Sequence, residues 1–144
     1  ITKLFEGKKI FTSYYQSNGF YDLKTHSFYS IKDFHGQHSL VVSGIANPFS
    51  FLNVLRQANV NTAHKLIFRD HKNYTDKEIQ LIRKEFYSSN AYSVITTHKD
   101  AVKLQRYSKE LDDIDIFYLQ IELRMDEEDE FRNFIFNKLT TTKP

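Results

Sequence analysis

The stretch "HSLVVSGIANPFSFLNVLRQANVNTAHKLIF", residues 38–68, decides the fold class, because it reads as a strand, a helix and a second strand. Its first part, residues 38–44, is a short apolar run of the kind found in buried parallel strands. The pair Asn47-Pro48 supplies a favourable N-cap and first helical residue, which predicts a helix over residues 47–58. A second strand is predicted over residues 62–68.

The same alternation continues to the end of the chain. Residues 74–89, 98–107 and 126–139 are predicted as helices, and residues 92–96 and 115–123 as strands. Such alternation predicts a Rossmann-like α/β fold, with a mostly parallel sheet of about four strands and flanking helices joined by right-handed crossovers.

Side-chain spacing supports the individual helices. Thr75 and Glu78, and likewise Thr97 and Asp100, stand at the spacing of a capping box. The last helix begins with acidic residues, which suits the positive end of the helix dipole. Its apolar residues are expected to pack inward: Phe131, Phe134 and Ile135.

The N-terminal region differs in pattern. Residues 8–23 are predicted as an antiparallel β-hairpin with its tight turn at Asn18-Gly19. The polar residues 24–37 are predicted as a linker or an irregular strand. The predicted division is therefore a hairpin and interdomain linker over 1–37, followed by an α/β domain over 38–144.

Composition narrows the class of protein. The 144 residues are 40% hydrophobic and 26% charged, as in an ordinary globular domain. A net charge of +2, with scattered Lys and Arg, does not indicate nucleic-acid binding. Without cysteine there is no disulfide framework or thiolate metal site. No apolar run reaches the roughly 18 residues of a membrane span.

No metal site is predicted. The histidines at 26, 35 and 38 match no ligand spacing that a helix or hairpin would provide.

Because ligands of open α/β sheets bind beyond the carboxyl ends of the strands, the loops there hold the candidate site residues. His71 and Asp70 follow the second strand of the α/β region, and a histidine beside a carboxylate can act as an acid, a base or an orienting group. The alternative is a solvated turn, which the residue types alone favour.

Five further residues are candidates for contact with a substrate or nucleotide. Lys99 stands at a helix N-terminus, where a phosphate would be stabilised, and Gly44 would allow a ligand close to the backbone. The alternative is that these loops contain only turns and caps. The full set is Gly44, Asn47, Thr97, Lys99 and Asp100.

A complete active site is missing from the sequence. The four glycines, at positions 7, 19, 36 and 44, cannot build either a P-loop or a dinucleotide-binding loop. The chain begins at Ile1 and its only methionine is Met125, from which we expect a segment of a longer protein.

Three segments taken together resemble a known family. They are "GIANPFSFLNVLRQANV" (44–60), "FRDHKNYTDKEI" (68–79) and "ITTHKDAVKL" (95–104), which resemble the C-terminal half of tetraacyldisaccharide 4′-kinase, the lipid A 4′-kinase. Residues 8–23 are similar to the paired strands that connect the two domains of that family. The sequence departs from the family at His98, where glutamate is usual.

The resemblance implies transfer of the ATP γ-phosphoryl group to the 4′-hydroxyl of tetraacyldisaccharide 1-phosphate, in the lipid A synthesis of Gram-negative bacteria. It implies an enzyme that is cytoplasmic and peripheral to the inner membrane, with ATP and Mg²⁺ bound mainly by an N-terminal P-loop domain. The residue that matches the family's Asp-His motif is His71, placed to orient or tune the catalytic aspartate of that other domain.

This chain lacks the P-loop domain, so the resemblance implies that it binds no cofactor and catalyses no transfer alone. Membrane contact would be made through the absent domain, and the aromatic hairpin is a hypothetical surface for self-association. The competing hypothesis is a non-catalytic Rossmann-like module that binds a small anionic ligand or a protein partner.

Overall fold

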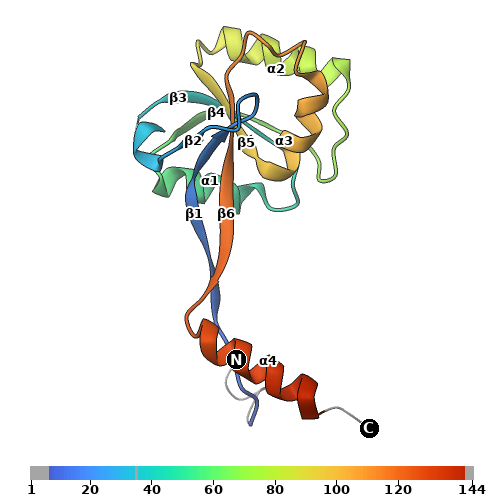
Figure 1. Cartoon of the computed structure of the whole chain (residues 1–144). Helices are drawn as coiled ribbons and strands as arrows, with labels where there is room; N and C mark the ends of the chain where they lie inside the picture. The colour runs from blue at the N-terminus through green and yellow to red at the C-terminus, as the bar shows by residue number, and fades with distance from the viewer. Residues whose placement is uncertain (1–6, 35, 142–144) are drawn as a thin grey trace. The chain divides into compact units, whose positions relative to one another are not determined.

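In the residues that the computed structural model describes, 7–34 and 36–141, six strands form a sheet in the order β2-β1-β6-β5-β3-β4 (Figure 1). Strand β3 pairs in parallel with β4 and β5, β5 pairs in parallel with β6, and β1 pairs antiparallel with β2. The elements in chain order are β1 (Ser13–Asp22), β2 (Phe28–Tyr29), η2 (Ile31–Phe34), β3 (His38–Ser43), α1 (Pro48–Gln57), β4 (Asn61–Ile67), α2 (Asp76–Ser88), β5 (Ser93–Thr97), α3 (His98–Leu104), η3 (Gln105–Tyr107), β6 (Ile116–Met125) and α4 (Glu128–Thr141).

The predicted α/β fold is confirmed. Each of the four predicted strands from residue 38 onward is present as β3, β4, β5 and β6, and each predicted helix as α1 to α4. The sheet is wider than about four strands because β1 and β2 extend it beyond β6.

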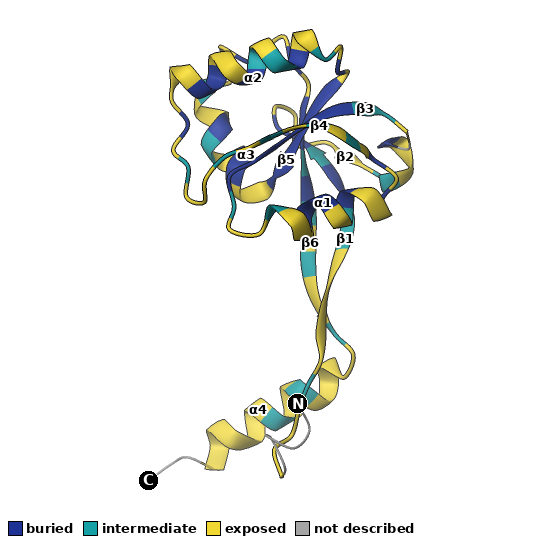
Figure 2. Cartoon of the chain, turned by 180° about the vertical axis from the view of Figure 1, so that it is seen from behind, coloured by how far each residue is buried: buried dark blue, intermediate teal, exposed yellow. Residues whose placement is uncertain are grey.

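Alternate residues of β3 face opposite sides of the sheet, as a buried strand requires. Leu40 and Val42 pack in a cluster with Ile82 of α2, whereas Val41 packs in a second cluster with Leu55 of α1. Helices α2 and α3 therefore cover one face and α1 covers the other (Figure 1). Figure 2 shows β3 and β5 buried along most of their length between these layers.

The strand order reverses between β3 and β5. The chain leaves β3 through α1 toward β4, then returns across the sheet to β5 and leaves through α3 on the opposite face. The loops that follow β3 and β5 therefore diverge and form the crevice in which open α/β sheets bind ligands.

The predicted hairpin is wrong. Strand β1 runs without a turn through Asn18 and Gly19. Gly19 has a φ of 151°, and a Cβ there would lie 2.5 Å from the Phe28 ring and 2.6 Å from the Tyr29 carbonyl oxygen of β2. The glycine serves a close approach between neighbouring strands instead of a turn.

The other neighbour of β1 is β6. The Leu23 N–H donates to the Ile116 carbonyl, and the Asp126 N–H donates to the Thr12 carbonyl. Because rising residue numbers in β1 meet falling numbers in β6, these strands run antiparallel.

The structure groups the residues differently from the predicted boundary at residue 37. Residues 17–121 form one compact unit, and residues 1–16 with 122–144 form the other. Residues 17–37 belong to the α/β unit because Phe20 and Phe34 are buried in its core, with ring centroids 4.3 Å apart.

The inward packing expected of α4 is wrong. Helix α4 belongs to the second unit and has no buried residue (Figure 2). Phe131 and Phe134 are half-buried against Phe11, at centroid distances of 5.1 and 5.5 Å, and Ile135 is exposed. No helix in the described part of the chain has the length and apolar character needed to cross a bilayer.

Candidate functional site

The carboxyl ends of β3, β4 and β5 bring most of the predicted site residues to one edge of the α/β unit. Gly44 follows β3, Asp70 and His71 follow β4, and Thr97 ends β5. Asn47 has a different role: it is exposed and caps α1, where its Oδ1 accepts the Ser50 N–H at 3.1 Å.

Asp100 is completely buried at this edge. Its Oδ2 accepts the Gly44 N–H at 2.9 Å and the Thr97 hydroxyl at 2.8 Å, while the Asp100 N–H donates to Thr97 Oγ1 at 3.1 Å. The predicted helix cap is present. The Asp100 carboxylate also connects the loop after β3 with the end of the adjacent strand β5. We define Gly44, Thr97 and Asp100 as the buried cluster.

The crevice beside the buried cluster is filled by the chain itself. A Cβ added to Gly44 would lie 3.1 Å from Lys72 Cβ, 3.2 Å from Asp100 Oδ1 and 3.4 Å from the Tyr74 hydroxyl. Burial, followed by the nearby Asp100 carboxylate, raises the pKa of Tyr74 well above its ordinary range. Glycine suits this position because an added Cβ would meet these neighbours more closely than side chains usually pack.

The Asp70-His71 segment faces outward instead. The Lys72 N–H donates to the Arg69 carbonyl at 3.2 Å, which closes a turn around Asp70 and His71. His71 has a φ of 56°, in the left-handed region that favours glycine but that histidine enters more often than most residues. The side chain of His71 is 79% exposed.

One carboxylate lies between two cationic or potentially cationic groups on this surface. Asp70 Oδ2 is 3.4 Å from His71 Nε2, and Asp70 Oδ1 is 3.6 Å from Lys99 Nζ. Asp70 Oδ1 also accepts the His71 backbone N–H at 2.8 Å. We define Asp70, His71 and Lys99 as the exposed cluster; two loops contribute to it.

The loop that carries His71 is anchored on both sides. Lys103 of α3 donates from Nζ to the Lys72 carbonyl at 2.7 Å, and the Tyr107 hydroxyl donates to the Tyr74 carbonyl at 2.8 Å. Lys72 Nζ in turn lies 2.7 Å from Glu78 Oε1 of α2. His71 is thus an exposed side chain on a fixed backbone.

Glu78 joins this loop to α2. Hydrogen bonds from Lys72, and then from Thr75, lower the pKa of Glu78 to about 2. Glu78 Oε2 accepts the Thr75 N–H at 2.9 Å and the Thr75 hydroxyl at 2.5 Å, so the predicted capping box is confirmed.

His98, the residue that departs from the family pattern, takes part in an aromatic stack. Its ring lies over Tyr118 of β6, with centroids 5.0 Å apart and planes at 22°. Tyr118 stacks in turn on Tyr21 of β1 at 5.6 Å. Sequence reasoning missed this contact because the spacing of these residues along the chain does not indicate that β1, β6 and α3 are neighbours.

The described residues were predicted to hold no metal site. Among them no three His, Cys, Asp or Glu side chains are grouped to hold a metal ion. His38 bonds the Ser89 carbonyl through Nε2 at 2.9 Å, and His35 lies outside the described residues. The Gly44 N–H donates to Asp100 Oδ2.

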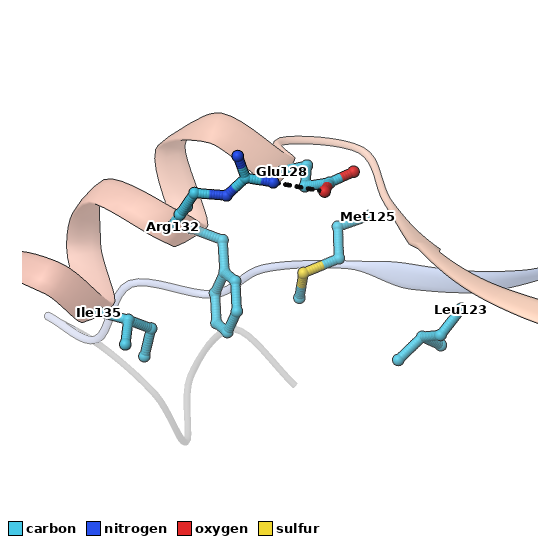
Figure 3. Close-up of a pocket in the computed structure, with 6 residues that line it drawn as sticks. Leu123, Met125, Glu128, Arg132 and Ile135 are labelled. Atoms are coloured by element: carbon cyan, nitrogen blue, oxygen red, sulfur yellow. Dashed lines mark hydrogen bonds and ion pairs between the residues drawn. The ribbon is translucent and has the colours of Figure 1, made fainter.

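A separate apolar groove lies within the second unit (Figure 3). It has a volume of about 310 Å³ and is lined by Leu123, Met125, Glu128, Phe131, Arg132 and Ile135. The side chains of Leu123 and Met125 come from β6, that of Ile135 from α4, and the Arg132–Glu128 ion pair of 2.9 Å borders the groove. The sequence predicts a strand only over residues 115–123 and places the last helix against the core, so it did not indicate this groove.

Comparison with known proteins places these features in context. The model of the tetraacyldisaccharide-1-P 4′-kinase family matches residues 2–140. A tetraacyldisaccharide 4′-kinase of Francisella philomiragia is 37% identical over 90 residues, which cover 62% of this chain and 26% of the relative. One from Pelobacter propionicus is 33% identical over 82 residues, which cover 57% and 23%. The chain spans about a quarter of the length of these curated relatives.

A similar fold is found in a solved structure. The crystal structure of LpxK from Aquifex aeolicus in complex with ATP has a TM-score of 0.61 and 20% identity, and the match covers 92% of this chain and 37% of the other. At this identity the likeness concerns the fold, which agrees with the sheet and helices described above.

Proposed function

The chain belongs to the tetraacyldisaccharide-1-P 4′-kinase family, and on that premise we propose that it is the C-terminal part of an enzyme that phosphorylates a lipid A precursor. The reaction is transfer of the ATP γ-phosphoryl group to the 4′-hydroxyl of tetraacyldisaccharide 1-phosphate. The similarity to tetraacyldisaccharide 4′-kinases of two bacteria supports the substrate class. The ATP-bound Aquifex structure supports the phosphoryl donor.

The nucleotide chemistry is assigned to a P-loop domain outside this chain, together with Mg²⁺ binding. Phosphoryl transfer depends mainly on positioning and on neutralising charge. The buried cluster supports this assignment, because its carboxylate occupies the N–H that a phosphate would need.

The exposed cluster is the single observation that carries the proposal for this chain. His71 is held outward on an anchored loop, in a backbone conformation with positive φ. Its imidazole, beside the Asp70 carboxylate, would orient or tune the catalytic aspartate of the P-loop domain. Lys99 stands 3.6 Å from Asp70 and would add positive charge toward the phosphates.

The alternative of a Rossmann-like module for a small anion is less well supported. A buried carboxylate in the crevice repels an anion, and the tight contacts around Gly44 leave little room for one. The exposed cluster has no evident purpose in such a module.

We assign the second unit to contact with the rest of the enzyme. Its helix α4 exposes Phe136 and Leu139, at 66% and 70% of their surface, and Ile135 of the same helix lines the apolar groove. Exposed apolar patches of this kind mark interaction surfaces. Self-association through the predicted hairpin is not retained, because β1 has no turn at Asn18-Gly19 and pairs with β2 instead. We propose that the intact enzyme acts at the cytoplasmic face of the inner membrane, which it reaches through parts outside this chain.

A 4′-kinase assay with radiolabelled ATP and tetraacyldisaccharide 1-phosphate tests the function. The intact protein that contains these residues should transfer phosphate, and the 144-residue chain alone should give neither transfer nor ATP hydrolysis. Steady transfer by the chain alone would show that the chemistry was assigned to the wrong part of the protein.

A further inference from the structure

Asp100 is the point at which the three site loops meet. Its Oδ2 bonds the loop after β3 through Gly44 and the end of β5 through Thr97. A helix cap alone would need only the Thr97 hydroxyl, which already accepts the Asp100 N–H at 3.1 Å. The contact with Gly44, 56 residues away, is therefore additional to capping.

The other carboxylate oxygen faces the loop that carries His71. Asp100 Oδ1 lies 4.0 Å from Lys103 Nζ, one turn further along α3. The same Nζ donates to the Lys72 carbonyl at 2.7 Å. Lys103 is thus held between the buried carboxylate and the residue that follows His71.

Tyr74 provides a second connection to the same loop. Its hydroxyl and Asp100 Oδ1 both lie near Gly44, within 3.4 and 3.2 Å of the position a Cβ would occupy. Both oxygens are buried and neither has another hydrogen-bond partner among the described residues. The phenol and the carboxylate therefore lie on the same side of Gly44, and the Asp100 carboxylate contributes to the raised pKa of Tyr74.

We propose that Asp100 is a positioning residue, whose buried carboxylate fixes the loop of residues 69–75, and His71 with it, through Lys103 and Tyr74. It touches no substrate, in contrast to the ligand contact expected from the sequence. The consequence for turnover rests on the function proposed above, whereas the effect on the loop does not.

Two substitutions interrupt the connection at different places. Asp100→Asn keeps the side-chain volume and an oxygen for Gly44 and Thr97, but removes the charge that attracts Lys103. Lys103→Met keeps the apolar stem and removes the hydrogen bond to the Lys72 carbonyl. Asp113→Asn is the matched control, because the hydrogen bonds to the Asp113 carboxylate come from Arg83 and Tyr87 of α2.

Backbone ¹⁵N relaxation of the 144-residue chain measures the loop directly. We expect the order parameters of His71 and Lys72 to fall from the rigid value of about 0.85 to below about 0.6 in both variants. They should stay unchanged in Asp113→Asn, even if that variant unfolds at a lower temperature. Unchanged order in a folded Lys103→Met chain would overturn the proposal, also if Asp100→Asn did not fold.

Kinetics of the intact kinase separate positioning from mere stability. Well below the unfolding temperature, each substitution should lower kcat about tenfold with little change in KM, since a misplaced group loses transition-state contacts. The double variant should be no slower than either single one, because both act through one contact. Additive losses, or a rise in KM alone, would overturn the kinetic part.

The proposed function and this inference fail in distinguishable ways. If His71→Ala leaves turnover unchanged, the catalytic assignment is wrong, and the order parameters still decide whether Asp100 holds the loop. If the order parameters do not change, the positioning role is wrong whatever His71 contributes.

Discussion

The buried cluster and the exposed cluster each contain one aspartate at the same edge of the sheet, yet they differ in what surrounds that carboxylate. Asp100 is fully buried and bonds Gly44 and Thr97, whereas the Asp70 side chain is 34% exposed beside His71 and Lys99. Burying a carboxylate costs free energy unless its oxygens accept hydrogen bonds. Folding of the chain therefore requires the hydrogen bonds that Asp100 accepts.

Stability does not account for the exposed cluster in the same way. An exposed ion pair such as Asp70–Lys99 contributes about 0–1 kcal/mol, and a non-glycine residue with positive φ costs about 1–3 kcal/mol. The backbone conformation at His71 therefore costs more folding free energy than the Asp70–Lys99 ion pair contributes. The comparison teaches that burial distinguishes a scaffolding carboxylate from one that is free to act on another group.

The largest effect on stability is expected from Gly44→Ala. The new Cβ would lie 3.1 Å from Lys72 Cβ and 3.2 Å from Asp100 Oδ1, so the buried cluster must spread. We expect a loss of about 1–3 kcal/mol in the free energy of unfolding, measured by urea denaturation. Ser43→Ala is the control, because its buried hydroxyl has no hydrogen-bond partner among the residues that the structure describes and its removal should cost little. Equal stability of Gly44→Ala and the parent chain would contradict the tight packing.

Asp70→Asn, in contrast to Gly44→Ala, should lower turnover and leave stability nearly unchanged. In the intact kinase we expect kcat about tenfold lower, because the imidazole loses its neighbouring charge, and a change in unfolding free energy below about 0.5 kcal/mol. Asp76→Asn, an exposed aspartate at the start of α2, controls for a general charge effect. A large loss of stability with normal kcat would make Asp70 a scaffolding residue like Asp100.

The smallest effect is expected from Glu78, and it depends on pH. Its pKa is lowered from 4.5 to about 2 in the folded chain, so its contribution to stability is present above pH 4.5 and is lost as pH falls toward 2. In the Glu78→Gln variant the urea midpoint should fall less steeply as the pH is lowered from 4.5 toward 2. Near neutral pH the dependence of the midpoint on pH should be the same as in the parent chain. An unaltered acid limb would mean that the bonds from Lys72 and Thr75 do not persist in solution.

Sequence alone predicted the part of the fold that depends on local signals. Caps at Asn47 and Thr75, and apolar runs at regular intervals, identified the strands and helices of the α/β unit. The rule that sites lie beyond the carboxyl ends of strands then selected loops that the structure brings together at one edge of the sheet.

What sequence could not provide were contacts between distant residues. Asp100 stands at capping-box spacing, and nothing local indicates that its carboxylate reaches Gly44. Asn18-Gly19 has the composition of a tight turn, but the approach of β2 to Gly19 decides its conformation. The stack of His98 on Tyr118 likewise depends on the position of α3 against β6.

The most direct test of the central claim replaces His71 in the intact kinase and measures both turnover and thermal stability. His71→Ala should lower kcat about 10²-fold or more. His71→Gly should lower it equally, and its unfolding temperature should not fall, because glycine adopts the φ of 56° without strain. Turnover that stays normal in His71→Gly would return Asp70 and His71 to a solvated turn and contradict the account.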